Sequence, residues 1–227
     1  MEYLDLLEAP KKEKRIVTPD YRNEENRRIA REYGRDFFDG DRVNGYGGYK
    51  YDGRWKKVAK KIKEEYGINP GDAVLEIGCA KGFLLHDLQE EIPGVRVAGI
   101  DVSEYAANNT MDGIENLEIA RKKVLPHIII GNAKTLPWPD NTFDLVININ
   151  TLHNLNEEDA SICIKEMIRV SRDPKKMFIQ VDAYTNEEEK TRMENWVLTA
   201  ETMKSDREWI DFLNKNGYKG NYFWTIV

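Results

Sequence analysis

The sequence contains few residues that could form disulfides or bind metals. Its 227 residues include 2 cysteines and 3 histidines. Cys79 and Cys163 are far apart and flanked by apolar residues, which suits reduced thiols better than a disulfide framework. Neither cysteine belongs to a pattern with metal-ligand spacing. We therefore exclude a small secreted domain held together by disulfides, and we expect no metal site.

Long hydrophobic segments are absent too. No stretch approaches the ~18 consecutive apolar residues of a membrane span. Near the N-terminus, the acidic residues Glu2 and Asp5 and then Pro10 stand where a signal peptide would have basic residues followed by an apolar run. The sequence therefore predicts a cytoplasmic protein with no membrane partner.

An excess of positive charge is also lacking. The formal net charge of −6 gives no long-range attraction to a phosphate backbone, which argues against nucleic acid as the main partner. The first 35 residues are locally basic, at positions 11–15 and 27–35, but glutamates lie among these basic residues. A solvated helix face is the simplest interpretation of this region.

The chain is long enough for one substantial core but short for two independent enzyme domains. We predict an N-terminal arm or lid over residues 1–50 and one domain over residues 51–227. The arm is polar and rich in glycine and proline, so we expect one helix around residues 23–33 and otherwise a mobile segment. The oligomeric state does not follow from the sequence.

Short apolar segments alternate with longer amphipathic segments from Tyr51 onward. Strands are predicted at residues 73–77, 96–100, 127–130, 143–149 and 177–181. Helices are predicted from Trp55 to near Gly67, at residues 82–91 and at residues 157–170. This alternation predicts an α/β fold that is doubly wound and Rossmann-like, with a mostly parallel sheet and helices on both faces. Ligands of such sheets bind beyond the carboxyl ends of the strands.

The loop after the first predicted strand carries the first candidate binding residues. From Glu76 to Gly82 it reads E-I-G-C-A-K-G, where glycines permit a tight turn and let a ligand approach the backbone before a helix begins. A dinucleotide fingerprint, G-x-G-x-x-G, would need glycines where Ala80 and Phe83 stand, which disfavours a nicotinamide-dependent oxidoreductase. The other alternative is that residues 76–82 bind no cofactor and form an ordinary turn between a strand and a helix.

Two later segments add to this loop. The second predicted strand ends in V-A-G-I-D-V-S, and its carboxylate, Asp101, can accept hydrogen bonds from both hydroxyls of a ribose. A surface helix cap is the alternative role for Asp101. Residues 131–147 then read G-N-A-K-T-L-P-W-P-D-N-T-F-D-L-V-I.

Over residues 73–181, these segments together resemble class I S-adenosylmethionine-dependent methyltransferases. The similarity is to the small-molecule enzymes related to the ubiquinone and menaquinone methyltransferases, in which the third segment usually reads G-D-A-x-x-L-P-F-x-D-x-x-F-D-x-V. Ala80 replaces the middle glycine of the first motif. The resemblance implies S-adenosyl-L-methionine as the cofactor and a methyltransferase domain over residues 51–227.

The resemblance also implies binding roles for individual residues. It assigns to the methionine end of the cofactor Glu76, Gly78, Cys79, Ala80 and Gly82. It assigns Asp101 and Val102 to the ribose and adenine, and Asn132 and Ala133 to the adenine. Asn132 replaces the acid that is usual in the family, but its amide can still accept from the adenine amino group and donate to a ring nitrogen.

The fourth predicted strand ends in polar residues. Asn148 and Asn150 alternate with isoleucines there, although a central parallel strand should be apolar on both faces. Buried amides need partners, and we favour the cofactor or substrate as the partner of Asn148 over a structural network. His153 follows, where it could take a proton from a nucleophile. Anchoring its loop is an equal alternative for His153.

The arm ends in a glycine-rich, aromatic stretch at residues 45–55. Aromatic faces favour a sulfonium cation, and Tyr49 is our candidate for this contact. Arg54 could pair with the methionine carboxylate or with an anionic substrate. A packed loop is the alternative.

Near the C-terminus, Ser205 and Glu208 form a predicted capping box. The family commonly ends in two antiparallel strands. This chain shows one closing strand, at residues 222–227, while residues 197–203 could form a second strand or a substrate loop.

Together these patterns predict a methyltransferase acting on a small-molecule substrate. The absence of an Asp/Asn-Pro-Pro-Tyr sequence after the fourth strand argues against the amino-methylating enzymes of nucleic acids and proteins. This favours an oxygen nucleophile, such as a sugar or polyol of a surface polysaccharide pathway. A non-catalytic adenosylmethionine-binding regulatory partner is the main alternative, ahead of a nicotinamide-dependent oxidoreductase.

Overall fold

The computed structural model describes residues 1–8, 18 and 21–226. The basic residues at positions 11–15, and Val227 at the end of the predicted closing strand, lie outside the described residues.

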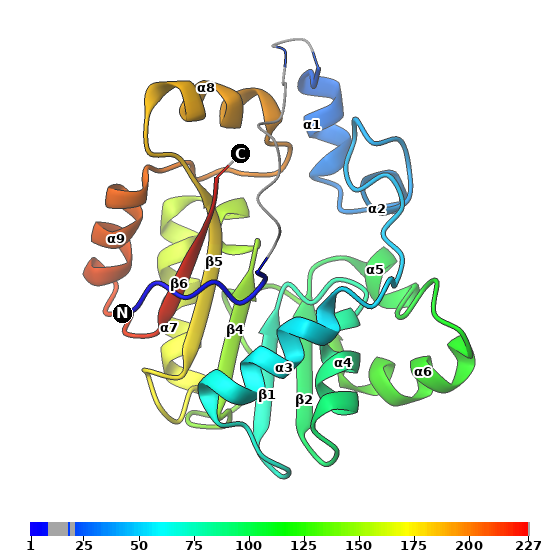
Figure 1. The fold of residues 1–227 in the computed structure, drawn as a ribbon. Coiled ribbons are helices and arrows are strands. Elements are labelled where there is room, and N and C mark those ends of the chain that lie inside the picture. Colours follow the sequence, from blue (N-terminus) through cyan, green and yellow to red (C-terminus); the bar gives the residue numbers. More distant parts are fainter. Residues whose placement is uncertain (9–17, 19–20, 227) are drawn as a thin grey trace.

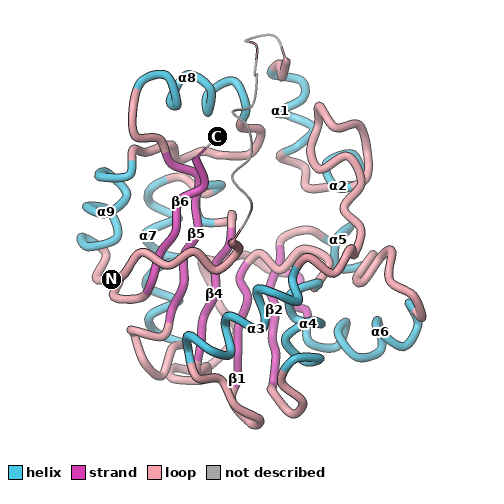
Figure 2. The backbone as a smooth tube through the Cα atoms, viewed as in Figure 1, coloured by secondary structure: helices cyan, strands magenta, loops and turns pink. Residues whose placement is uncertain are grey.

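Six strands of the described chain form one sheet in the order β3-β2-β1-β4-β5-β6 (Figures 1 and 2). All neighbouring pairs are parallel. The strands are β1 (Ala73–Ile77), β2 (Arg96–Asp101), β3 (Ile128–Ile130), β4 (Leu145–Ile149), β5 (Met177–Ala183) and β6 (Asn221–Ile226). The order reverses between β1 and β4, whose residues are all buried. Ligands of doubly wound sheets bind beyond the carboxyl ends at such a reversal.

Helices cover both faces of the sheet, which confirms the predicted fold class. One face packs against α3 (Trp55–Tyr66), α4 (Phe83–Glu91) and α6 (Leu117–Val124), and the other against α7 (Glu157–Val170) and α9 (Asp206–Lys215). Alternate residues of the strands enter the two hydrophobic clusters; Leu75 and Ile77 face α7, whereas Val74 faces α4. Burial on both sides explains the continuous apolar runs of the sequence.

Local signals set the helix ends close to the predicted positions. Gly67, with φ of 62°, ends α3 in the left-handed conformation. Asn156 caps α7 through the backbone N–H of Asp159, and the predicted capping box of Ser205 and Glu208 opens α9. The short helix α5 (Glu104–Asn108) follows β2, with Ser103 as its cap.

The end of the chain departs from the expected antiparallel arrangement. β6 pairs with β5 in parallel, with Val181 opposite Trp224. Residues 197–203 form no strand; the backbone N–H groups of Glu201 and Thr202 both donate to the carbonyl oxygen of His153, at 3.0 Å. The expectation of an antiparallel ending was therefore wrong, because the connection through α8 (Glu187–Trp196) and α9 returns the chain to the starting end of the sheet before β6 begins. Residues 197–203 instead support the loop after β4.

The described part of the arm contains two helices, α1 (Glu24–Ala30) and α2 (Arg35–Phe38), of which only α1 was predicted. Figure 1 shows both helices, and α8, beyond the carboxyl ends of the strands. Trp196 at the end of α8 joins these elements, because the Tyr21 ring stacks on it at 6.2 Å and the Arg22 guanidinium lies 4.0 Å from its ring centroid. The described part of the arm is thus packed against the C-terminal half of the chain.

No helix among residues 1–8, 18 and 21–226 is both long and apolar enough to cross a lipid bilayer.

Candidate cofactor and acceptor site

The loop after β1 has the backbone of a ligand-binding turn. Gly78, Ala80 and Gly82 all have positive φ values, of 80°, 47° and 74°. A Cβ atom at Gly78 would lie 1.8 Å from Thr151 Oγ1, so only glycine fits there. Gly82 then leads into α4. Gly78 is therefore required by its backbone conformation and by the approach of the loop after β4. Gly82 has the same conformational reason, and a Cβ atom there would lie 2.8 Å from the side chains of Val124 and Ile128.

Ala80 occupies a position where glycine would be easier to accommodate. Its left-handed conformation costs an L-residue roughly 1–2 kcal/mol. The position is fixed by a hydrogen bond from the Ala80 backbone N–H to Asp101 Oδ2, at 2.7 Å. Ala80 therefore adopts, at an energetic cost, a conformation that glycine would adopt more easily.

Asp101 connects the ends of β1 and β2. Besides Ala80, the backbone N–H of Ser103 donates to it, at 2.8 Å. Burial raises the pKa of Asp101, while these backbone hydrogen bonds oppose the rise. A carboxylate offers about four lone-pair directions, so Asp101 keeps acceptor capacity beyond these backbone donors. Val102 beside it is 57% exposed, which leaves an apolar surface where the resemblance predicts adenine.

The other predicted adenine contacts lie after β3. The Gly131 backbone N–H donates to the Asp101 carbonyl, which brings this segment next to the end of β2. Asn132 Oδ1 accepts from the Lys134 N–H at 2.9 Å, within its own turn, and Ala133 is 8% exposed. The roles of Asn132 and Ala133 in adenine binding stay predictions.

Glu76 is the most perturbed acid of the site. Its side chain is buried, and its Oε2 atom has no hydrogen-bond partner among the described residues. Burial, reinforced by the charge of Asp101, raises the pKa of Glu76 to about 8. A buried carboxyl oxygen without a partner calls for a donor, preferably a cationic one. Cys79 is buried too, and burial raises the pKa of its thiol; its backbone N–H donates to the Ile100 carbonyl oxygen at 3.3 Å, and its role in cofactor binding stays a prediction.

Aromatic residues of the arm lie over this loop. Tyr49 stacks on Phe83, the first residue of α4, with ring centroids 4.9 Å apart, and Tyr46 contacts Tyr49 at 4.5 Å. Tyr46 is 44% exposed, but desolvation by the groups around its hydroxyl, followed by the charges of Asp101 and Asp182, raises its pKa to about 12. Tyr46 is therefore within electrostatic range of both Asp101 at the end of β2 and Asp182 near the end of β5. Phe83 thus serves packing at the position where a dinucleotide fingerprint would need glycine.

Arg54 lies at the start of α3 and is paired on the protein surface. Its Nη2 atom lies 2.6 Å from Asp52 Oδ2, and its side chain is 65% exposed. The guanidinium still influences the hydroxyls of Tyr46 and Tyr49 electrostatically. Binding a carboxylate through Arg54 would require exchange of Asp52 for the ligand, and this role stays a prediction.

Asn148 and His153 both have partners within the protein. Asn148 is fully buried, and its Oδ1 accepts from the Leu152 N–H at 2.9 Å. His153 Nδ1 accepts from the backbone N–H of Asp182 at 3.0 Å. Burial lowers the pKa of His153, although the charge of Asp182 opposes this. These contacts favour structural roles for Asn148 and His153 among the alternatives, while their contacts with cofactor or acceptor remain untested predictions.

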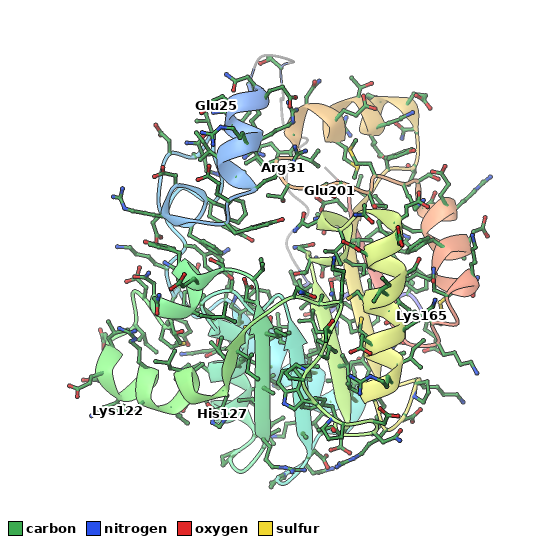
Figure 3. The ribbon with its side chains drawn as sticks, turned by 180° about the vertical axis from the view of Figure 1, so that it is seen from behind. Glu25, Arg31, Lys122, His127, Lys165 and Glu201 are labelled. Atoms are coloured by element: carbon green, nitrogen blue, oxygen red, sulfur yellow. The ribbon has the colours of Figure 1, made fainter. Side chains whose placement is uncertain are left out.

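Three residues of the site were not predicted. Asp182, near the end of β5, and Tyr33 and Glu201 face the same region. Burial raises the pKa of Tyr33, the charges of Glu201 and Asp101 raise it further, and the charge of Arg31 opposes this rise. Figure 3 shows Arg31 at the end of α1 and Glu201 after α8. The position of Asp182, directly after the apolar run of β5, could have revealed it. Tyr33 and Glu201 carry no such signal, because only tertiary packing joins them.

No cluster of three or more His, Cys, Asp or Glu side chains suited to a metal ion occurs in the part of the chain that the structure describes.

The turn after β1, the sheet order and the hydrogen bonds of Asp101 at the end of β2 define a doubly wound α/β domain. Residues 74–173 match the methyltransferase domain family. A demethylmenaquinone methyltransferase of Symbiobacterium thermophilum is 34% identical over 100 residues, which cover 40% of this chain and 36% of that protein. The match thus spans only about a third of that relative's length, so the likeness to the class I S-adenosylmethionine-dependent methyltransferases is that of the domain at residues 74–173.

Solved structures agree with this fold. The YcgJ protein of Bacillus subtilis has a TM-score of 0.55 and 17% identity, over 70% of this chain and 66% of that one. A SAM-dependent methyltransferase of Aquifex aeolicus has a TM-score of 0.50 and 24% identity, over 74% of this chain and 89% of that one. At these identities the comparison concerns the fold.

Proposed function

We propose that this chain transfers a methyl group from S-adenosylmethionine to a hydroxyl oxygen of a small polar molecule. The observation that carries the proposal is the loop at residues 78–82. Its left-handed residues direct the Ala80 N–H to Asp101, next to the unpartnered oxygen of Glu76. The match of residues 74–173 to methyltransferase domains supports the same cofactor.

The residues present fit this cofactor. The unpartnered, buried oxygen of Glu76 suits the ammonium group of the methionine end. Asp101 has acceptor capacity left for the ribose, and exposed Val102 offers an apolar contact for adenine. When bound, the cofactor supplies the sulfonium methyl group.

The acceptor would then lie over β4 and β5. Polar groups gather on that side: Asp182 near the end of β5, Glu201 after α8, and the hydroxyl of Tyr46. A quinone with an apolar tail would need an apolar surface here. The polar groups support an acceptor that carries several hydroxyls, such as a sugar or polyol, and not the quinone that the name of the Symbiobacterium relative indicates for that enzyme.

Positioning is the main task of the protein in such a reaction. Methyl transfer requires nucleophile, methyl group and sulfur in line, and orientation alone can contribute roughly 7–11 kcal/mol. The aromatic residues Tyr46 and Tyr49 would exclude water, and His153 holds the loop after β4 against β5. Removal of the hydroxyl proton would fall to a group on the acceptor side, for which His153 is our sequence-based candidate.

Calorimetry with S-adenosylmethionine, followed by label transfer from its methyl group, tests the proposal. Acceptor panels should include free and nucleotide-linked sugars, polyols and reduced naphthoquinones. We expect binding of S-adenosylmethionine and label on a sugar or polyol oxygen. Label on a quinone alone would overturn the acceptor class, and binding without transfer to any partner would favour the regulatory alternative. Binding of a nicotinamide cofactor in its place would overturn the family-based cofactor.

A further inference from the structure

One ion pair joins the candidate cofactor loop to the N-terminal arm. Lys81 stands between Ala80 and Gly82 in the loop, and its side chain is 0% exposed. Its Nζ atom lies 2.7 Å from Asp39 Oδ2, directly after α2 of the arm, and 3.2 Å from Asp112 Oδ2. A fully buried ammonium is costly unless it is paired, so the arm supplies part of what the loop needs to fold.

Asp39 in turn organises the aromatic part of the arm. Its second oxygen, Oδ1, accepts from the backbone N–H of Tyr49 at 3.0 Å. The hydroxyl of Tyr105, on α5, donates to Oδ2 at 2.8 Å. One carboxylate therefore holds the cofactor loop, α5 and the aromatic segment of the arm at a single point.

The same contacts reach the candidate ribose site. The backbone N–H of Ala80, the residue before Lys81, donates to Asp101. Ser103, two residues after Asp101, donates through its hydroxyl to the carbonyl oxygen of Tyr33 in the arm. The residues proposed to hold the cofactor are thus bound to the arm on two sides, at Lys81 and at Ser103.

We propose that Lys81 is a positioning residue that couples the order of the arm to cofactor binding through its ion pair with Asp39. This inference rests on the proposed cofactor. Because coupling between two sites is reciprocal, the factor by which a formed arm raises cofactor affinity equals the factor by which cofactor stabilises the formed arm. Couplings of this kind typically amount to about 5- to 150-fold.

Asp39→Asn in the full-length protein tests the coupling from the arm side. The variant removes the charge that faces Lys81, while Asp112 keeps the ammonium partly paired. We expect S-adenosylmethionine affinity to fall about tenfold. In the wild-type protein, S-adenosylmethionine should slow hydrogen exchange of residues 33–50, and in Asp39→Asn a saturating amount should no longer do so.

Asp36→Asn is the matched control. Asp36 belongs to the same helix, α2, and its side chain is 62% exposed and 3.9 Å from Arg35. Its substitution should leave affinity and protection unchanged. Lys81→Met should weaken binding about as much as Asp39→Asn, and the double variant Lys81→Met/Asp39→Asn should lose little more than either single variant, because both remove one interaction.

The possible outcomes separate the coupling from the function. If wild-type protein binds S-adenosylmethionine and Asp39→Asn binds it equally well, with only a lower melting temperature, the pair is structural and the coupling is overturned. Additive losses in the double variant would overturn it too. If the wild-type protein does not bind S-adenosylmethionine, the proposed function fails and the coupling with it, even where Asp39→Asn speeds exchange of the arm in the free protein.

Discussion

The imidazole of His153 is held by the backbone of Asp182. Its Nδ1 atom accepts the Asp182 N–H at 3.0 Å, and its Nε2 atom lies 3.8 Å from Asp182 Oδ2. Because Nδ1 uses its lone pair in this bond, the neutral ring carries its proton on Nε2. In this state the ring joins the loop after β4 to β5. To accept a proton at Nδ1, the ring would have to break its hydrogen bond with the Asp182 N–H.

Substitutions of His153 separate the two roles. The side-chain oxygen of asparagine can replace Nδ1 as the acceptor, whereas alanine cannot. If His153 is an anchor, His153→Asn should retain stability and most turnover, and His153→Ala should lose about 1–3 kcal/mol because a buried N–H loses its partner. If His153 is the base, both variants should lose ~10²–10⁴-fold in turnover with cofactor affinity nearly unchanged. Saturated turnover and urea unfolding of both variants decide between them.

Asp101 should carry much of the cofactor affinity. Asp101→Ala removes the acceptor of the ribose hydroxyls and the partner of the Ala80 N–H. We expect S-adenosylmethionine binding to weaken by about one to two orders of magnitude, or roughly 1.4–3 kcal/mol. Calorimetry measures the dissociation constant. The control is Asp140→Ala, at an exposed aspartate that pairs with Arg169. Equal affinity of folded Asp101→Ala and wild-type protein would exclude Asp101 from the site.

The sequence predicted the sheet well because its strands are buried on both faces. β1 and β4 are apolar except for Glu76 and Asn148, and the glycines between β1 and α4 mark a turn whose backbone only glycine tolerates at Gly78. The carboxylate at the end of the second predicted strand, and then the family resemblance, made Asp101 a candidate ribose ligand. The parallel direction of β6 could not be predicted, since strand direction depends on where the preceding helices return the chain.

The sequence could not predict which side chains pair with one another in the folded protein. Asn148 was expected to face a ligand, but a fully buried amide in a strand can equally bind the adjacent loop, as it does at Leu152. Lys81 and Asp39 are far apart in sequence, and a lysine within a glycine-rich loop is usually a solvated residue. Only the packing of the arm on the loop identifies their ion pair.

Ala80 should limit the stability of the cofactor loop. Ala80→Gly removes the cost of a left-handed alanine, roughly 1–2 kcal/mol, and adds the chain entropy of glycine, about 0.4–1 kcal/mol. We expect a small net gain in the free energy of unfolding. Ala120→Gly, within α6, should instead lose about 1 kcal/mol. Chemical denaturation of both variants measures the contrast, and a clear loss in Ala80→Gly would show that the alanine side chain contributes contacts that outweigh its strain.

Glu76 should make both stability and cofactor binding depend on pH. Its pKa rises from 4.5 in the unfolded chain to about 8 in the folded protein, because burial and the charge of Asp101 disfavour the ionised form. The folded state therefore binds more protons than the unfolded state between these values. From this group alone, stability is highest below pH of about 4.5, falls as the pH rises and levels off above about 8.

Glu76→Gln removes this titration. The difference in unfolding free energy between Glu76→Gln and wild-type protein should grow in favour of the variant as the pH rises from about 5 to 8. Urea unfolding across this range measures it. Glu64→Gln, at an exposed glutamate, should show no such trend. A difference that does not change with pH would mean that Glu76 titrates in the folded protein as it does in the unfolded chain.

Binding of S-adenosylmethionine gives the second measurement on the same group. An ammonium beside Glu76 favours the carboxylate, so binding near pH 6.5 should release a proton from a group that is protonated in the free protein. Calorimetry in buffers of different ionisation enthalpy counts this proton, and affinity should increase with pH between about 5.5 and 7, where the α-amino group of the ligand is still charged. In Glu76→Gln the proton release should disappear. Proton release that persists unchanged in Glu76→Gln would assign it to another group, with Asp101 the next candidate because burial raises its pKa as well.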